Sequence, residues 1–332
     1  MKKTLYTLQN RRVLRLGLLT SLACAPAFTA DYEVPLTEFG QPNLRGVWNF
    51  SSDVPLERPL NQPDKLTISV DELGEKRASA AAQKKQADDY TGNALGVGGY
   101  NTFWIENESQ INDLRTSLII DPANGRLPKM LDGAVIQRGG LGPDIPGERP
   151  VRYRVGGIAK NGPEDRGLSE RCLKGFNSGP PFVPSLYNNN VQIFQTANHV
   201  VLMTEMIHDA RIIPLGELPR LGADMAPWSG ESRAHWEQDT LVVETENFTN
   251  KTNSFRYAGT ADNMKLTERF TRVAPDRMNY EFTLDDPNTY ESSFTVLVPM
   301  PRAQGVIYEY ACHEGNYGLH NVLAGARREE LE

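Results

Sequence analysis

The segment Tyr308–His320, YEYACHEGNYGLH, is rich in side chains that can carry chemistry. The whole chain has five histidines and three cysteines, and this segment holds two of the histidines and one of the cysteines. Such residues serve as acids, bases, metal ligands or disulfide partners. The segment is therefore a candidate reaction centre or metal site, and a structural corner without chemistry is the alternative.

Residues Val306–Cys312 are predicted to form the last strand of the chain, because β-branched and aromatic side chains dominate them. Strand alternation places Glu309 and His313 together on the face opposite Val306 and Tyr308. If that face lines the interior of a barrel, Glu309 and His313 are predicted to act as an acid and a base. If it faces solvent, they form an ordinary surface pair.

A second group of ionisable residues lies at the end of the strand predicted at His199–Ile207. Both faces of this region are mainly apolar, which is typical of a strand covered on both sides. Glu205, His208 and Asp209 would then need partners, because burying an unpaired charge is costly. We expect Arg211 to pair with Asp209 or Glu205, and His208 with Asp209 to act as an oriented base. A strand end at which His208 and Asp209 emerge into solvent is the alternative.

The tail is a weak metal motif. His320 lies seven positions after His313, so the two imidazoles do not share a helical face as they do in a zinc-binding helix. A metal held by His313, Glu314 and His320 through loop geometry is kept as a minor possibility, and no cofactor is predicted. The chain also lacks a Gly-x-Ser-x-Gly elbow, which disfavours a serine hydrolase of that type.

Aromatic residues beside polar turn residues are candidates for a binding wall. Tyr100 and Trp104 lie in one such segment, and Trp228 and Arg233 lie in another. A small, partly apolar ligand suits such a wall, with Arg233 orienting an oxygen or a carboxylate. Packing anchors are the alternative role for the tryptophans. The predicted binding residues also include Arg211, Glu314 and His320.

The first thirty residues have the pattern of a cleaved export signal. Five basic residues and no acidic residue precede or border the apolar run Leu16–Phe28, and small residues follow it. Asn10–Leu14 partly matches a twin-arginine signal, and an ordinary secretory signal is the default reading. The mature chain is therefore expected in the periplasm or outside the cell. No later segment is apolar over eighteen residues, so no membrane span is predicted in the mature chain.

The charge balance of the chain disfavours nucleic acid as a partner. Removing residues 1–30 leaves 30 basic residues against 42 acidic ones, a formal difference of −12. Nucleic acids and anionic lipid surfaces would repel such a protein. We expect the charge to support solubility, and we expect the partner to be a small-molecule substrate or ligand.

The elements that must position these residues are one helix and a long series of strands. Ser69–Glu72 is a capping box that opens a helix to about Asp89. A hairpin is predicted from Ser117–Asp121 through Gly125. The remaining predicted strands are 191–195, 199–207, 211–215, 232–236, 240–245, 266–273, 278–284, 294–299 and 306–312.

Short, turn-like connections make consecutive strands antiparallel neighbours, because a parallel return needs a dozen or more residues. The sequence therefore predicts a mainly β protein, an antiparallel meander that closes into a barrel or a half-open barrel. A two-sheet sandwich is the alternative. We expect a single domain at 31–332, with an arm and the long helix at 31–115 and a β-rich body at 116–332. A terminal helix is predicted at Leu319–Leu331.

Cys172 and Cys312 are separated by 140 positions and are expected in an oxidising compartment. A disulfide between them is predicted, and two free buried thiols are the alternative.

Several segments resemble a widespread group of exported bacterial proteins. The resemblance implies that the arm, the helix and the meander belong to one unit, and it assigns no activity and no residue roles. The segments that carry it are PNLRGVW (42–48), YNTFW (100–104), RTSLIID (115–121), IHDARIIPL (207–215), LVVET (241–245) and 308–325.

The leading functional hypothesis is an exported, cofactor-free enzyme that uses general acid/base chemistry on a small, partly apolar molecule, as a lyase, isomerase or hydrolase. A non-catalytic barrel that binds a small ligand is the alternative.

Overall fold

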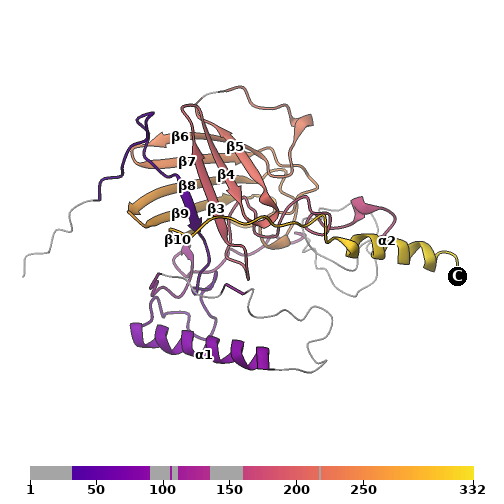
Figure 1. Ribbon diagram of the computed structural model, residues 1–332, viewed down its shortest axis with the longest axis horizontal. Helices are drawn as coiled ribbons and strands as arrows, with labels where there is room; N and C mark the ends of the chain where they lie inside the picture. The colour runs from indigo at the N-terminus through magenta and orange to yellow at the C-terminus, as the bar shows by residue number, and fades with distance from the viewer. Residues whose placement is uncertain (1–31, 90–104, 107–110, 135–159, 217) are drawn as a thin grey trace, which may run out of the picture. The chain divides into compact units, whose positions relative to one another are not determined.

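Alternating apolar residues build two antiparallel sheets in this protein, which is mainly β (Figure 1). The structure is a computed structural model, and it describes residues 32–89, 105–106, 111–134, 160–216 and 218–332. Contacts divide the chain into Met1–Glu33 and Val34–Glu332, and both sheets belong to the second unit. No helix of the described residues is long and apolar enough to span a membrane.

The smaller sheet has four strands and the larger sheet has six. The order in the smaller sheet is β1-β3-β4-β5, with β1 Gly46–Asn49, β3 Asn190–Gln195, β4 His199–Thr204 and β5 Ala210–Pro214. The order in the larger sheet is β2-β10-β9-β8-β7-β6, with β2 Ile119–Asp121, β10 Phe294–Pro301, β9 Arg277–Asp285, β8 Lys265–Ala274, β7 Thr240–Glu246 and β6 Glu231–Glu237.

The predicted mainly β, antiparallel character is confirmed, and the strands form two sheets in place of one continuous meander. Eight of the nine predicted strands are present, and Val306–Cys312 belongs to no sheet, with Cys312 in a turn. The predicted hairpin after Asp121 is wrong, because β2 pairs with β10 instead. The predicted arm contributes β1, which pairs with β3, so the arm and the β-rich body share a sheet.

The two sheets touch at both sides. A bridge joins Trp48 of β1 to Arg302, and the Ala303 N–H donates to the Val47 carbonyl at 2.9 Å. On the other side Leu215 and Ala234 form a parallel bridge. Within the described residues no continuous ladder joins the sheets.

The space between the sheets is filled by side chains. Inward-facing residues alternate along every long strand, and large aromatic rings occupy the middle. Phe182 lies against Phe270 and Tyr280, with ring centroids 6.4 and 5.4 Å away. Rings packed in this way account for much of the apolar area removed from water on folding.

Two helices flank the sheets. The helix α1, Val70–Asp89, begins where the capping box predicts, because the Ser69 hydroxyl accepts from the Glu72 N–H and the Glu72 carboxylate accepts from the Ser69 N–H. The helix α2, Tyr317–Glu329, confirms the predicted terminal helix and begins two residues earlier, where the Asn316 side chain caps it.

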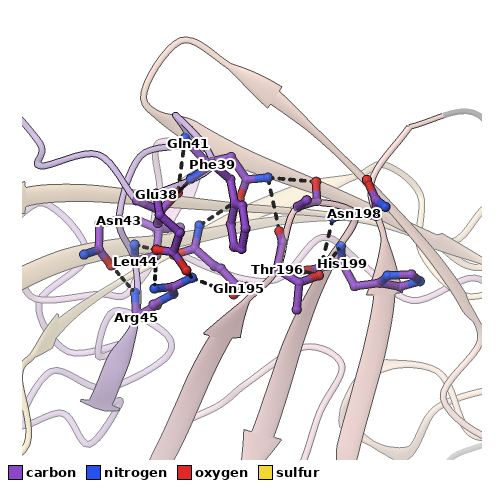
Figure 2. Close-up of polar contacts among 12 residues, drawn as sticks. Glu38, Phe39, Gln41, Asn43, Leu44, Arg45, Gln195, Thr196, Asn198 and His199 are labelled. Carbon is purple, nitrogen blue, oxygen red and sulfur yellow. Dashed lines mark hydrogen bonds and ion pairs between the residues drawn. The ribbon is translucent and has the colours of Figure 1, made fainter.

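The arm is fixed to the turn between β3 and β4, and Figure 2 shows these contacts. The Gln41 side chain donates to the Thr196 and Ala197 carbonyls at 3.2 and 3.0 Å. The Leu44 N–H donates to the buried Gln195 side chain at 2.7 Å. These bonds satisfy the polar groups of the turn and hold the arm in place as it enters β1.

Candidate functional site

A tight turn at Glu205–Asp209 replaces the end of the strand predicted at His199–Ile207. The strand β4 ends at Thr204, and Ile207 and His208 then adopt φ values of 60° and 43°. A β-branched residue rarely adopts a positive φ, because its side chain crowds the backbone. Backbone strain of this kind persists only where surrounding contacts hold it, and it is found more often at functional sites.

Contacts from the segment before β3 hold this turn. Lys174 is buried and forms an ion pair with the Asp209 carboxylate. The Ser178 hydroxyl donates to the Met206 carbonyl at 2.9 Å. Gly175 is needed for the close approach, because a Cβ at this position would lie 2.1 Å from Met206 Cγ.

Glu205 is buried in the same turn, with 7% of its surface exposed. Burial raises the pKa of its carboxyl group; a hydrogen bond from Asn190 opposes this, and the nearby Glu106 carboxylate adds to it. The Asn190 amide donates to the Glu205 carboxylate at 2.8 Å. The backbone N–H of Tyr308 is a further donor to the same carboxylate, which brings the tail to this corner.

The predicted acid/base residues of the turn lie in different surroundings. His208 is exposed and Asp209 is half-buried against Lys174. The predicted pairing of Arg211 with Asp209 or Glu205 is wrong, because Arg211 points into the core and pairs with Glu268. The catalytic roles of His208 and Asp209 stay predictions.

The tail residues are on the surface. Glu309, His313, Glu314 and His320 are all exposed, and the predicted interior face does not form because Val306–Cys312 joins no sheet. No group of metal-ligating side chains is present among the described residues. The tail nevertheless reaches the Glu205 corner through the backbone N–H of Tyr308. The catalytic and binding roles of these four residues stay predictions.

The predicted disulfide is confirmed between Cys172 and Cys312, whose Cα atoms are 5.7 Å apart. It ties the tail to the segment that carries Lys174. The Asn316 side chain adds a hydrogen bond to the Glu170 carbonyl at 2.6 Å. Together they fix the start of α2 against this segment.

The predicted binding wall stays a prediction, because only part of it lies within the described residues. Tyr100 and Trp104 lie outside them. Trp228 is half-buried, and Arg233 donates to the Pro219 carbonyl at 2.8 Å and pairs with Glu231. Arg233 is therefore already engaged by the protein.

A cleft of about 530 Å³ lies beside α1, and we call it the α1 cleft. One wall comes from α1, and the other comes from the arm and the loop before β3. Its lining residues are Ser52, Asp53, Lys76, Arg77, Ala80, Glu106, Pro184, Ser185 and Leu186.

One ion pair and several hydrogen bonds fix the walls of the α1 cleft. The Arg77 guanidinium donates to the Asp53 carboxylate at 2.7 and 2.9 Å, and the Lys76 ammonium donates to the Asp53 carbonyl at 2.5 Å. The Glu106 carboxylate accepts from the Asn188 and Asn189 N–H groups at 3.0 and 3.2 Å. Glu106 lines the cleft, and its carboxylate also raises the pKa of Glu205 electrostatically.

The sequence reasoning missed this cleft. One signal was present, because Leu73, Arg77, Ala80 and Lys84 recur at helical spacing on an otherwise polar helix. In the structure Leu73 is buried. Arg77 donates to the Ile111 carbonyl, and Lys84 donates to the Ile105 carbonyl. This face of α1 packs against the rest of the protein, and the α1 cleft lies beside it.

A second buried polar cluster lies between the sheets. Arg211 makes two bonds to Glu268, at 3.1 and 2.6 Å, and the Tyr280 hydroxyl donates to Glu268 at 2.8 Å. The hydroxyls of Ser232 and Thr245 accept from the same guanidinium at 3.0 and 3.2 Å. Burial raises the pKa of Tyr280 far above its ordinary value, so its hydroxyl stays a proton donor to Glu268. Packed aromatic rings surround the cluster, and its role is therefore to stabilise the core.

Comparisons with protein-family models, with curated proteins and with solved structures find no match.

Proposed function

We propose that this protein binds a small, partly apolar molecule in the α1 cleft. The observation that carries the proposal is the lining of the cleft, where Ala80, Pro184 and Leu186 lie beside the charged groups of Lys76 and Glu106. Small-molecule sites typically combine apolar walls with a few polar groups that fix orientation. A volume of about 530 Å³ suits a molecule of that class.

The polar groups of the α1 cleft suggest how such a ligand is oriented. The Lys76 ammonium has three donor protons and gives one to the Asp53 carbonyl, so it can also donate to a ligand oxygen. Both carboxylate oxygens of Glu106 accept from backbone N–H groups, which fixes the carboxylate before a ligand binds and so reduces the entropy lost on binding. A ligand with an oxygen at one end and a hydroxyl or amine at the other matches this arrangement.

Native mass spectrometry tests the proposal. The protein purified from its natural source is expected to carry an added mass that disappears when the α1 cleft is filled by Ala80→Trp. Ala82→Trp is the matched control, because Ala82 is exposed on the same helix and does not line the cleft. Equal retention of the added mass by both variants would place the ligand elsewhere.

A second candidate function is general acid/base catalysis on the bound molecule without a cofactor, as a lyase, isomerase or hydrolase. It is favoured by a pair of neighbouring carboxyl groups, Glu106 in the lining of the α1 cleft and the buried Glu205, because the raised pKa of Glu205 favours the protonated form that a general acid needs. Once the ligand is identified, turnover by Glu205→Gln and Glu106→Gln tests this. His208→Ala and His313→Ala test the surface histidines, and loss of turnover at an unchanged melting temperature is the result that supports them.

Two further proposals concern architecture and location. We propose that the two sheets form one half-open barrel, supported by the bridges Trp48–Arg302 and Leu215–Ala234 at its two sides. Residues 1–30 are proposed to be a removable export signal, supported by the disulfide, which is typical of proteins in oxidising compartments. Peptide mapping of the protein from its natural source tests the cleavage near residue 30.

A further inference from the structure

Two charged side chains of the α1 cleft have only uncharged partners. The Glu106 carboxylate accepts from the Asn188 and Asn189 N–H groups at 3.0 and 3.2 Å and from the Asn189 side-chain amide at 3.0 Å. The Lys76 ammonium donates to the backbone carbonyl of Asp53. Among the described residues, neither Glu106 nor Lys76 forms an ion pair.

The other charged side chains of the α1 cleft compensate each other. The Arg77 guanidinium pairs with the Asp53 carboxylate at 2.7 Å, so neither of them is left for a ligand. Lys76 and Glu106 line the same cleft without pairing with each other. The α1 cleft therefore presents one uncompensated positive charge and one uncompensated negative charge at separate points.

The wall that carries Glu106 is fixed before a ligand arrives. Asn189 is completely buried and holds Glu106 through both its backbone and its side chain. The same side chain accepts from the Ser185 N–H at 2.8 Å and donates to the Ser185 carbonyl at 2.9 Å. Because Ser185 also lines the cleft, Asn189 sets the position of two lining residues at once. Polar groups ordered in this way lose little entropy when a ligand binds.

An apolar surface lies in the same cleft as the two charges. Ala80, Pro184 and Leu186 belong to the lining, and Leu186 is 55% exposed. Covering such a side chain with an apolar group of a ligand removes apolar area from water and stabilises the complex.

We propose that the ligand of the α1 cleft is a zwitterion with an apolar side chain, an apolar amino acid or a short apolar peptide. Its ammonium group pairs with Glu106, its carboxylate pairs with Lys76, and its side chain covers Leu186. This inference rests on the proposed function and deepens it by naming the chemical class of the ligand.

Charge complementarity favours a zwitterion over the other classes of small molecule. A neutral ligand would take water from both charges without compensating either, which is costly. An anion would leave Glu106 uncompensated, and the formal net charge of −7 would repel it. A cation would leave Lys76 uncompensated. A zwitterion compensates both charges and carries no net charge.

Isothermal titration calorimetry with four leucine derivatives tests the proposal on the unaltered protein, dialysed beforehand to release bound ligand. L-leucine and leucyl-leucine carry both charges, N-acetyl-leucine lacks the ammonium group, and leucinamide lacks the carboxylate. The tighter binder of the first two shows whether an amino acid or a peptide is the source of the zwitterion. We expect N-acetyl-leucine to bind at least about tenfold more weakly than L-leucine, because it loses a charged hydrogen bond to Glu106. For leucinamide we expect a loss of about two- to fivefold, because Lys76 is exposed and exposed ion pairs contribute little.

Variants assign each charge of the ligand to its partner. Glu106→Gln is expected to abolish the difference between L-leucine and N-acetyl-leucine and to keep the difference between L-leucine and leucinamide. Lys76→Gln is expected to do the reverse. Glu75→Gln is the matched control, because Glu75 is exposed on α1 outside the lining of the cleft, and it should keep both differences. An unchanged melting temperature shows that each variant is folded.

Equal binding of L-leucine and N-acetyl-leucine by the wild type, or binding of none of the four probes, would overturn the proposal. The proposed function would still stand if the mass carried by the natural protein disappears in Ala80→Trp. Binding of the zwitterions that Ala80→Trp leaves unchanged would also overturn the proposal, because it would place their site outside the α1 cleft.

Discussion

The buried Arg211–Glu268 pair makes a demanding stability prediction. The Glu268 side chain is completely buried and that of Arg211 is 6% exposed, so solvent cannot replace either partner. Arg211→Met leaves the Glu268 carboxylate with the Tyr280 hydroxyl as its one remaining hydrogen-bond donor among the described residues, and Glu268→Leu leaves the guanidinium with two hydroxyl acceptors. Removing one partner of a buried pair typically costs about 3–5 kcal/mol, and we expect each single variant to lose that amount of unfolding free energy.

The double variant Arg211→Met with Glu268→Leu should lose much less. The buried charges are then gone, and the main penalty is the Tyr280 hydroxyl, which no longer has its acceptor and costs about 1–3 kcal/mol. The two single losses should therefore exceed the double loss by at least about 3 kcal/mol.

Urea unfolding at pH 7 measures these three free energies, with an unchanged denaturant slope as the check that unfolding stays comparable. Single losses below about 1 kcal/mol that add up in the double variant would refute the reasoning. Such a result would mean that water reaches the pair, because only exposed ion pairs contribute so little.

Three further predictions concern the corner and its surroundings. The raised pKa of Glu205 favours its neutral form in the folded state, so the stability that this group contributes is present below its ordinary pKa of 4.5 and is lost as the pH rises through the raised value. The difference in unfolding free energy between the wild type and Glu205→Gln, measured by urea unfolding, should therefore change over this pH range. Gly175→Ala should destabilise the protein by about 1–3 kcal/mol, because its Cβ would lie 2.1 Å from Met206 Cγ in the turn. Gly325→Ala in α2 has open space around it and should stabilise the protein by about 0.5–1 kcal/mol. Thermal unfolding measures both variants, and equal effects would contradict the packing. Cys312→Ser should cost about 2–4 kcal/mol and speed hydrogen exchange in α2, and unchanged exchange would show that α2 docks without the disulfide.

Most of the fold could be predicted from the alternation of apolar and polar residues along the strands. The hairpins of β6 to β10 have a clear two-residue period and short turns, so their pairing follows from local chemistry. Residues Val306–Cys312 have the same period and were predicted to form a strand of the sheet. They join no sheet, because a sequence pattern does not show whether a neighbouring strand is present. The strand predicted at His199–Ile207 was likewise too long, because the apolar pattern continues past Thr204, after which the backbone turns.

The Arg211 ion pair and the α1 cleft depend on residues that lie far apart in the sequence. Arg211 has Asp209 and Glu205 near it in the sequence, and its actual partner, Glu268, lies 57 positions away on β8. Nothing in the local pattern distinguishes these carboxylates. The α1 cleft likewise depends on how α1 docks through Leu73 and Arg77, which a nearly all-polar helix indicates only weakly.

The most direct test of the central claim is a crystal structure of the protein purified from its natural source. The account predicts electron density for a small organic molecule in the α1 cleft, between Ala80 and Leu186, with a polar atom within hydrogen-bond distance of Lys76 or Glu106. A cleft that holds only water while an organic molecule occupies another site would contradict it.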